Sequence, residues 1–427
     1  MFFALFCRNL HPKQRYKKKL MAYSVFKYCL IVFLTALLSG CLVNTHSEFD
    51  NVPPKAYMSL QKPLVAAYLH IGTRKIDPNT IDIRGVDIIN LAFTVINNNR
   101  IGLLYSNHAD YFVAVNKLKT NYPNLRVIIS VGGYGTEKQF QKMASTPESR
   151  AIFVDDAVRF VKYFNFDGID VDWEYPGMDK TTRNADRKNF TSLLSELRTA
   201  LDSASRIDGK KYLLTIASGA FEPYLTYTEP AVIAPLVDYF FVMTYDFVGQ
   251  WNDVTGHHTN LYSSSFKKTG YSVDRIVKAY IRSGIPSHKI VIGAAAYGRK
   301  WNDVQSSKNG LFKVAKGEGS ISYSKITELE KNRDYLKCWD KAACAPYLFS
   351  NKYKTFISYD NTESVRRKVD YVNIHSLGGI MYWEYFSDSK LRILHSITDQ
   401  MRISRNQIVM PKILQFQQQK NVKKIAN

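Results

Sequence analysis

The chain has 427 residues, of which 45% are hydrophobic, and a formal net charge of +21 at pH 7. A charge of this size suggests a nucleic-acid binder, but thirteen of the net charges lie at the two ends of the chain. Residues 1–41 hold seven Lys and Arg, residues 401–427 hold six, and neither segment contains an acidic residue. We therefore do not expect nucleic acid as a partner, and the length and composition indicate one large globular domain with a smaller one.

Residues 1–41 have the features of an export signal rather than of a folded domain. A basic stretch precedes an apolar run at residues 28–38, which is too short to span a bilayer comfortably. The run leads into the sequence LSGC, which ends at Cys41 and resembles the lipidation signal of bacterial lipoproteins. An ordinary signal peptide or an anchor helix is the alternative, and either Met1 or Met21 fits as the start of the chain.

The signal predicts an exported protein of the cell envelope, an outer-membrane or surface lipoprotein held to the membrane by a lipid on Cys41. Residues 42–60 are polar and form the expected tether between the lipid and the folded domain. Cys338 and Cys344 remain in the body of the chain. An oxidising compartment permits a disulfide between them, and the sequence leaves open whether it forms.

Apolar runs typical of strands alternate with runs of helical period over residues 61–400, which is the pattern of a parallel α/β sheet. Helical stripes lie at residues 153–164, 190–201 and 273–281, and a further helix is expected at Thr362–Asn373. Eight near-continuous apolar runs predict strands that are buried on both faces: Leu64–Leu69, Ile88–Val95, Arg126–Val131, Gly168–Glu174, Tyr212–Ser218, Tyr239–Tyr245, Ile290–Tyr297 and Gly379–Tyr385. Eight strands with helices between them predict a (β/α)8 TIM barrel, whose active site gathers at the carboxyl ends of the strands.

The connection between the seventh and eighth predicted strands is far longer than the others. Residues 300–356 are mixed in character and rich in aromatic side chains. A long ordered insertion in a barrel usually shapes its site, so we expect a small α+β insertion domain here. Residues 401–427 are basic and rich in glutamine, and they are expected to form a disordered tail.

The fourth predicted strand carries an unusual set of acidic residues. In the sequence FDGIDVDWEYP, which covers residues 166–176, Asp170, Asp172 and Glu174 alternate with apolar residues and so share one face of a strand. Three carboxyl groups on one buried face are costly, because each resists ionising beside the others. A solvated acidic edge or a metal site is the alternative, but apolar neighbours argue against the first and the lack of a nearby histidine against the second.

This stretch resembles the signature of glycoside hydrolase family 18, the chitinase family, through its four acids, the glycine after the first acid and the Trp-Glu-Tyr-Pro ending. The resemblance implies a retaining, substrate-assisted route in which the N-acetyl group of the sugar is the nucleophile. Glu174 would then be the acid and base, Asp172 would orient the acetamido group, and Asp170 would share a proton with Asp172. Asp167 is expected to be structural.

Other strand ends match further motifs of the family. Tyr245 is expected to bind the acetamido oxygen, Asp246 to help hold the distorted sugar, and Trp383 to form the floor on which the sugar stacks. The glycines of the sequence SVGG are expected to let backbone approach the sugar. Core packing is the alternative for the aromatic residues of the floor. The substrate-binding residues that the resemblance implies are Tyr68, Phe93, Gly132, Gly133, Tyr134, Gly135, Tyr175, Met243, Thr244, Trp251, Arg299 and Trp383.

The resemblance implies a monomeric chitinase of endo type that hydrolyses β-1,4-linked N-acetylglucosamine polymers, namely chitin and chitooligosaccharides. We expect no cofactor and no metal, and His257 and His258 are not expected to bind one. The insertion resembles the domain that forms one wall of the groove in larger family members. Two alternatives stay open: a non-catalytic chitin-binding lectin, which the intact Glu174 disfavours, and an enzyme that acts on peptidoglycan or N-glycans.

Overall fold

The computed structural model describes residues 62–74, 77–265, 270–305 and 307–405. The predicted signal, the lipidation site Cys41, the tether and most of the predicted tail therefore lie outside the described residues. No helix within the described ranges is both long enough and apolar enough to cross a membrane.

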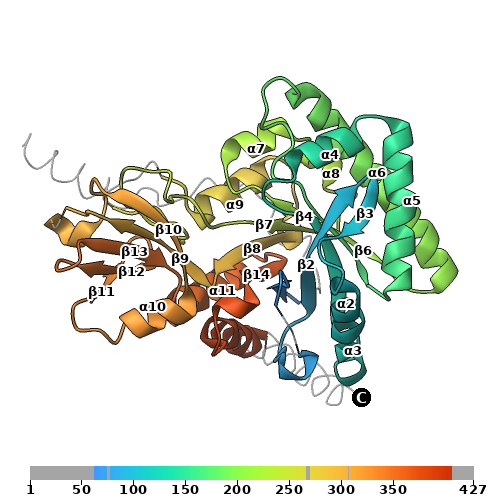
Figure 1. The fold of residues 1–427 in the computed structure, drawn as a ribbon. Helices are drawn as coiled ribbons and strands as arrows, with labels where there is room; N and C mark the ends of the chain where they lie inside the picture. Colours follow the sequence, from blue (N-terminus) through green and yellow to red (C-terminus); the bar gives the residue numbers. More distant parts are fainter. Residues whose placement is uncertain (1–61, 75–76, 266–269, 306, 406–427) are drawn as a thin grey trace, which may run out of the picture. The chain divides into compact units, whose positions relative to one another are not determined.

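A closed barrel of eight parallel strands forms the larger part of the described chain (Figure 1). All eight predicted strands are present, and pairing of the first with both the second and the last closes the barrel, which confirms the predicted (β/α)8 fold. The short strand β3 (Arg100–Leu103) pairs antiparallel with β2 at the edge. The barrel strands are β1 (Leu64–His70), β2 (Ile88–Asn97), β4 (Arg126–Gly132), β5 (Gly168–Asp172), β6 (Leu213–Ser218), β7 (Tyr239–Val242), β8 (Ile290–Ala295) and β14 (Gly379–Trp383).

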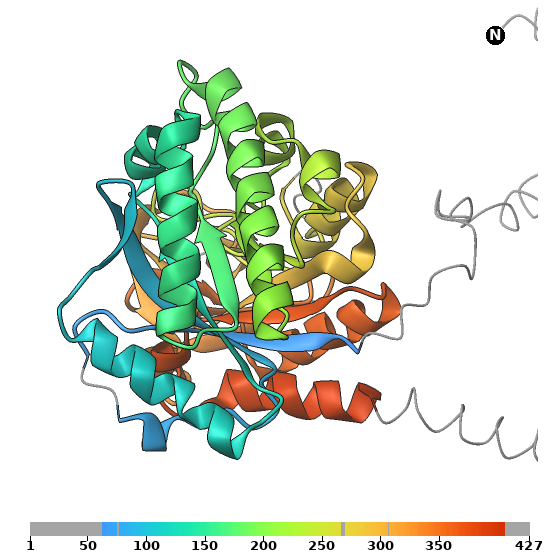
Figure 2. The same cartoon turned by 90° about the vertical axis from the view of Figure 1, so that its right-hand side faces the viewer.

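Helices cover the outside of the barrel, and the long pair α5 and α6 runs side by side there (Figure 2). Helix α5 begins directly after Thr146, because the Thr146 side chain accepts a hydrogen bond from the backbone N–H of Ser149. Helix α6 ends at Gly209, whose φ of 61° suits a residue without a side chain. The helices around the barrel are α2 (His108–Asn116), α3 (Leu118–Asn121), α4 (Glu137–Ala144), α5 (Pro147–Tyr163), α6 (Arg183–Asp208), α7 (Glu222–Tyr227), α8 (Pro230–Ile233), α9 (Val273–Arg282), α11 (Thr362–Ile374) and a helix over residues 392–405.

The interior of the barrel changes character along its length. A compact apolar cluster fills much of it, with Ala66, Ile128 and Phe241 among its fully buried members. Buried polar side chains lie among these apolar ones, and they include Asp170 and Thr215. Asp170 lies in the middle of β5 and Thr215 in the middle of β6, and the substrates of barrel enzymes bind beyond the carboxyl ends of such strands.

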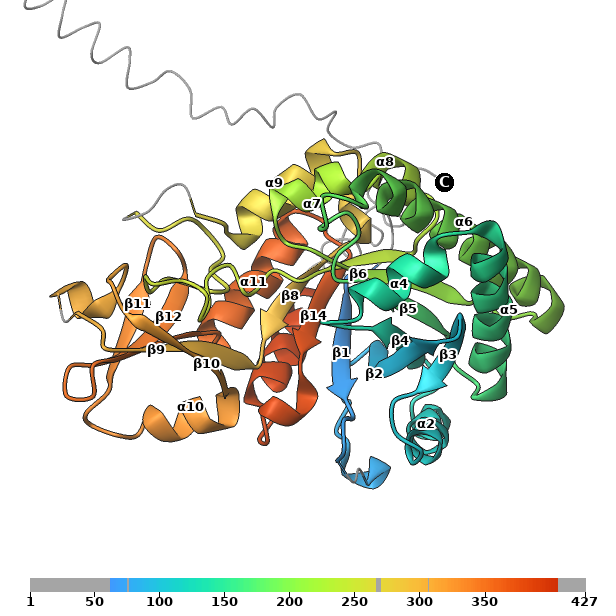
Figure 3. The same ribbon diagram turned by 45° about the horizontal axis from the view of Figure 1, so that its top comes forward.

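A second sheet of five strands is inserted between β8 and β14 (Figure 3). Its strand order is β10-β9-β13-β12-β11, and all of its pairings are antiparallel. It starts and ends slightly outside the predicted range, since Tyr297 opens its first strand and Tyr359 closes its last. The elements are β9 (Tyr297–Asn302), β10 (Lys316–Ser322), α10 (Tyr323–Leu329), β11 (Leu336–Asp340), β12 (Ala345–Ser350) and β13 (Thr355–Tyr359).

Two sequence-based expectations need correction. The seventh barrel strand ends at Ala295 rather than at Tyr297, because Tyr297 already belongs to β9 of the second sheet. The predicted tail begins too early, because residues 401–405 continue the last helix and Met401 is fully buried. Arg405 also donates a hydrogen bond of 2.8 Å to Asp87.

The two cysteines of the second sheet do not form a disulfide in the structure; both are free thiols. Cys338 lies in β11 opposite Tyr347, whereas Cys344 lies in the turn that precedes β12 and has a φ of 50°. Each sulfur atom faces a carbonyl on its own side of the hairpin, that of Leu336 for Cys338 and that of Lys341 for Cys344. The hairpin register therefore keeps the two thiols apart.

Candidate active site

Asp170 is the innermost acid of the candidate site and is completely buried. Three hydroxyl groups donate to its carboxylate, from Tyr68 at 2.9 Å, Ser130 at 2.8 Å and Thr215 at 2.6 Å. Burial raises the pKa of Asp170, and these hydrogen bonds oppose that rise. The donors come from β1, β4 and β6, so Asp170 joins three strands across the barrel interior.

Asp172 and Glu174 continue this acidic row toward the open end of the barrel. Strand β5 stops at Asp172, so Glu174 lies beyond the regular strand in which we expected it. Burial raises the pKa of Asp172 well above its usual value, and the charges of Glu174 and Asp170 raise it further. One oxygen of Asp172, Oδ1, is buried without a hydrogen-bond partner. A buried oxygen of this kind is costly unless a bound ligand satisfies it.

Glu174 has a pKa of about 7, raised mainly by burial and further by the charge of Asp246. A hydrogen bond with the Tyr175 hydroxyl lowers it in part. The pKa of a general acid is most useful near the working pH, because the group can then both give and take a proton. Glu174 therefore has the protonation behaviour of an acid and base near neutral pH.

Asp246 follows β7 and forms a second charged group of the site. Arg299 of β9 holds both of its oxygens, with Nε 2.7 Å from Oδ1 and one NH2 nitrogen 2.6 Å from Oδ2. The fully buried ring of His258 lies with Nδ1 3.6 Å from Asp246 Oδ1. Burial alone would raise the pKa of Asp246, but His258 and Arg299 together hold it well below its usual range. Asp246 is therefore ionised wherever Glu174 can exchange a proton.

Tyr245 directly precedes Asp246, and the charges of Asp172, Glu174 and Asp246 all act on its hydroxyl. Burial raises the pKa of its hydroxyl well above the usual value, followed by the charges of Asp172 and Glu174. A Cβ atom at Gly293 of β8 would lie 2.7 Å from its ring, so only glycine fits beneath it. The hydroxyl contacts the sulfur of Met381 at 3.8 Å. Tyr245 thus keeps a protonated hydroxyl among the carboxyl groups.

Aromatic rings form a floor beside the acids, as expected. Trp383 at the end of β14 lies 5.5 Å from the Tyr68 ring and 5.7 Å from the Phe93 ring, measured between centroids. Tyr68 is at the same time buried and bound to Asp170, so its packing and site roles combine. His70 stacks on Trp383 at 6.0 Å and was not expected in the site. Its position at the end of β1 could have indicated a place in the site, because the carboxyl ends of the strands meet at one end of the barrel.

Two glycines at the end of β4, Gly132 and Gly133, are crowded by other parts of the protein. A Cβ atom at Gly132 would lie 2.3 Å from the carbonyl oxygen of Asp172, and one at Gly133 would lie 2.9 Å from the Phe93 ring. Their φ angles of 115° and 90° also favour glycine. These glycines therefore give room to other parts of the protein, the backbone of Asp172 and the Phe93 ring. Gly135 has open space around it, and the neighbouring Tyr134 is 91% exposed.

The loop after β7 brings Trp251 to the edge of the site. Its ring is 57% exposed and the guanidinium of Arg299 lies 5.1 Å from it. Arg299 also donates to the side chain of Gln250 at 2.9 Å. A Cβ atom at Gly317 of β10 would lie 2.2 Å from the carbonyl oxygen of Gln250, so the second sheet packs directly against this loop. The site is therefore built jointly by the barrel and the inserted sheet.

The remaining predicted residues lie in the same area. Thr244 is fully buried, Met243 packs against the apolar cluster of the barrel interior, and the Tyr175 ring packs against Phe221. His258, which the sequence predicts only not to bind a metal, contacts Asp246. Within the described ranges, no group of three or more His, Cys, Asp or Glu side chains is arranged to hold a metal ion.

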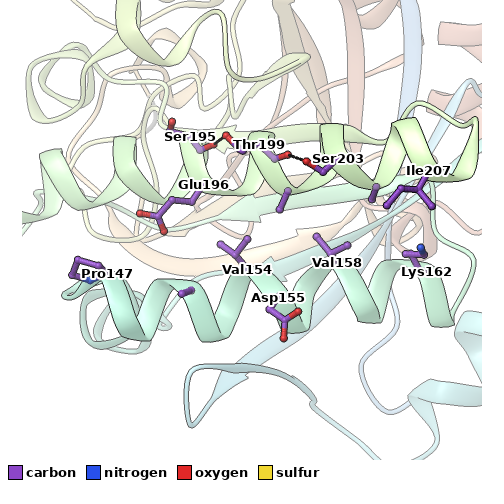
Figure 4. Close-up of a pocket in the computed structure, with 13 residues that line it drawn as sticks. Pro147, Val154, Asp155, Val158, Lys162, Ser195, Glu196, Thr199, Ser203 and Ile207 are labelled. Carbon is purple, nitrogen blue, oxygen red and sulfur yellow. Dashed lines mark hydrogen bonds between the residues drawn. The ribbon is translucent and has the colours of Figure 1, made fainter.

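A groove of about 630 Å³ lies elsewhere, between α5 and α6 on the outside of the barrel (Figure 4). Val154, Val158 and Ala200 give it an apolar floor, and charged side chains such as Glu196 stand at its edges. None of its lining residues belongs to the candidate site. The acids and aromatic rings described above therefore remain the candidate for chemistry.

Comparison with known proteins agrees with this arrangement. Chitinase A1 of Niallia circulans is 40% identical over 294 residues, which cover 64% of this chain and 42% of that protein. A glycoside hydrolase family 18 N-acetylglucosaminidase from Paenibacillus barengoltzii is 35% identical, with a TM-score of 0.73 over 79% of this chain and 100% of the other. A class V chitinase from Nicotiana tobaccum, solved in complex with NAG4, is 26% identical, with a TM-score of 0.73 over 80% and 100% of the two chains.

The chain thus spans less than half the length of its Niallia circulans relative and the full length of the two solved chains. The family model described as glycosyl hydrolases family 18 matches residues 65–388, from the start of β1 to just after β14. That range contains all but the first residue of the barrel strands, the second sheet and every acid of the candidate site. The chain belongs to glycosyl hydrolases family 18.

Proposed function

We propose that this chain is a chitinase that hydrolyses β-1,4-linked N-acetylglucosamine polymers, with retention of configuration and with the substrate's own N-acetyl group as nucleophile. The observation that carries the proposal is the pKa of Glu174, raised to about 7 beside Asp172, which has its own pKa raised by burial. A carboxyl group that keeps its proton near pH 7 can deliver it to a glycosidic oxygen.

In this proposal Glu174 protonates the leaving oxygen while the acetamido oxygen of the sugar attacks the anomeric carbon. Asp172 receives the acetamido N–H on its unpartnered Oδ1 and stabilises the positive charge that develops there. Asp170 keeps its place through three hydroxyl donors and its charge favours a proton on Asp172. Glu174, now a carboxylate, then takes a proton from the water that opens the cyclic intermediate.

Tyr245 and Asp246 bind the same sugar. The protonated Tyr245 hydroxyl is a donor for the acetamido oxygen, which places that oxygen for attack. Asp246 is held ionised by Arg299 and His258 and is a fixed acceptor for a sugar hydroxyl. Trp383 supplies a flat surface for the apolar face of the ring, and the exposed rings of Tyr134 and Trp251 extend that surface outward.

A lectin on the same fold would bind the sugar without needing an acid that exchanges protons. The retained Glu174, with its raised pKa, therefore favours hydrolysis over binding alone. The similarity to a chitinase solved with NAG4 supports N-acetylglucosamine oligomers as ligands. The second sheet, which packs against the loop that carries Trp251, is proposed to be the chitinase insertion domain and one wall of a groove for long polymers.

The test of this function replaces Glu174 by glutamine and follows N-acetylchitotetraose by product analysis. We expect turnover to fall by about 10³-fold, because the general acid is lost while the shape of the site is kept. Circular dichroism and a binding titration on the same variant serve as the control for folding. Turnover equal to that of the unaltered chain would contradict the proposal.

A product profile on chitin, chitooligosaccharides, peptidoglycan and an N-glycan fixes the substrate class. We expect N-acetylated chitooligosaccharides to be cleaved and fully deacetylated ones to resist, because they lack the internal nucleophile. Rapid cleavage of the deacetylated oligomer would contradict the substrate-assisted route, and binding of every oligomer without cleavage would favour a lectin.

We also propose that the chain is exported, acts as a monomer and carries a lipid on Cys41. The support is the sequence LSGC after an apolar run. Replacing Cys41 by serine is expected to move the protein from the membrane fraction to the soluble fraction. An unchanged membrane fraction would contradict lipidation at this residue.

A further inference from the structure

A second buried charged cluster lies behind the substrate-binding end of β7 and β8. Lys368 of α11 and Asp360, which follows β13, are both completely buried, with Nζ 2.6 Å from Oδ2. Lys368 also donates to the Thr259 hydroxyl at 2.6 Å. An ammonium group this deeply buried is tolerated only when its acceptors are held close, so the cluster fixes its members in one arrangement.

Asp360 uses its remaining hydrogen-bonding capacity on other elements. Its Oδ2 accepts the backbone N–H of Ala295, the last residue of β8, at 3.1 Å, and its Oδ1 accepts the Ser364 hydroxyl of α11 at 2.7 Å. The ion pair therefore ties the exit from the second sheet, the end of a barrel strand and the following helix to one another.

The cluster reaches the candidate site through the Thr259 hydroxyl and through Lys368 itself. Thr259 Oγ1 donates to the backbone carbonyl of Thr244 at 3.0 Å, and Thr244 is the residue directly before Tyr245. Thr244 in turn bonds to Gly293 through both the N–H and the carbonyl of that glycine, at 2.7 Å and 3.0 Å. Lys368 Nζ also lies 3.4 Å from the Gly293 carbonyl oxygen.

Both supports of the Tyr245 ring are therefore attached to this cluster. The backbone that precedes Tyr245 is held by Thr259, and Gly293, the glycine beneath its ring, is held by Thr244 and Lys368. A reacting group must be placed to well within 1 Å for full rate, so a shift of either support is expected to reduce turnover.

We propose that Lys368, acting through Thr259, is a positioning residue for Tyr245 and so for the acetamido group that attacks the anomeric carbon. This inference rests on the proposed function and deepens it, because it assigns a role in the reaction to a buried ion pair that touches no substrate. The pair binds the inserted sheet to the barrel at the point where Tyr245 must be held.

The test removes the connecting hydroxyl and keeps the ion pair. Thr259→Val has nearly the same shape and leaves Lys368 its contacts to Asp360 and Gly293. We expect kcat on N-acetylchitotetraose to fall about tenfold, because Tyr245 loses one of its supports. Thr259→Ser restores the hydroxyl and is expected to restore kcat. Thr355→Val, which removes a buried hydroxyl from the second sheet, is the control and is expected to keep kcat.

A binding titration with variants that also carry Glu174→Gln tests the inference without requiring turnover. There we expect Thr259→Val to weaken the affinity for N-acetylchitotetraose about threefold, through the misplaced Tyr245. Equal kcat and equal affinity for Thr259→Val and Thr355→Val would overturn the inference, even if both variants unfold at a lower temperature. An unaltered chain that binds the tetramer but does not hydrolyse it would contradict the proposed function and leave the inference to be decided by affinity.

Discussion

Two buried acidic groups at the carboxyl end of the barrel differ in what neutralises them. Asp360 faces the ammonium group of Lys368 at 2.6 Å, so its charge is compensated within the fold. Asp170 faces three hydroxyl groups, and the pKa values of Asp172 and Glu174 beyond it are raised by burial. A compensated carboxylate holds structure together, whereas an uncompensated one holds a proton and is available for chemistry.

Breaking the compensated pair is expected to have the largest effect on stability. Lys368→Met leaves Asp360 buried without its counter-ion and is expected to lower the free energy of unfolding by about 3–5 kcal/mol. Urea unfolding measures this change. The control is Lys325→Met in α10, which breaks an exposed pair with Glu328 and is expected to leave the free energy of unfolding nearly unchanged. Similar losses in the two variants would contradict the comparison.

Replacing Asp172, a buried carboxyl group without a counter-ion, is expected to affect turnover rather than stability. Asp172→Asn removes a buried carboxyl that has an unpartnered oxygen, so we expect the free energy of unfolding to stay the same or to rise. We expect kcat on N-acetylchitotetraose to fall about a hundredfold, because an amide side chain cannot offset the positive charge that develops on the acetamido group. A loss of stability as large as that of Lys368→Met would show that Asp172 is structural.

The raised pKa of Glu174 predicts a pH-dependent stability. In the folded chain Glu174 holds its proton up to about pH 7, whereas in the unfolded chain it releases the proton near the ordinary pKa of 4.5. The contribution of Glu174 to the free energy of unfolding is therefore fully present below pH 4.5 and is lost as the pH rises through 7. Glutamine mimics the protonated form. The stability of Glu174→Gln relative to the unaltered chain should therefore rise by about 1–3 kcal/mol between pH 4.5 and pH 8. Urea titrations at the two pH values measure it, and no change would argue against the raised pKa.

Removing Trp251 at the edge of the site is expected to have the smallest effect of these changes. Trp251→Ala removes an exposed ring that stacks with Arg299, so we expect about 1 kcal/mol of lost affinity for N-acetylchitohexaose and little change in kcat. Tyr163→Ala, which removes an 83% exposed ring from α5, is the matched control. Equal affinities of the two variants for N-acetylchitohexaose would show that Trp251 does not contribute to binding.

The barrel could be predicted from the sequence because its strands are continuous apolar runs and its helices have capped, striped patterns. The strands of the second sheet could not, since β10 (KGEGSIS) and β11 (LKCWD) have neither a regular alternation nor a long apolar run. β10 and β11 pair with neighbouring strands, β9 and β12, and the sheet is completed by the distant pairing of β9 with β13. Local sequence carries no signal of such pairing.

In the candidate site, too, local features could be predicted from the sequence and contacts between distant residues could not. Asp170, Asp172 and Glu174 could be predicted to lie together because they share one short segment with a strand period. The contacts of Asp246 with Arg299 and of Thr259 with Lys368 join positions 53 and 109 residues apart, and only the folded chain reveals them. The crowding around Gly132 and Gly133 could not be predicted either, because the atoms that crowd them belong to distant residues.

The central claim is that Glu174 is a proton donor with a pKa near neutrality. The pH dependence of kcat/KM on N-acetylchitotetraose tests it most directly, because its alkaline limb reports the acid form of the free enzyme. We expect kcat/KM to fall tenfold per pH unit above pH of about 7, where Glu174 loses its proton. A profile that stays flat up to about pH 9 would contradict the assignment of Glu174 as the acid.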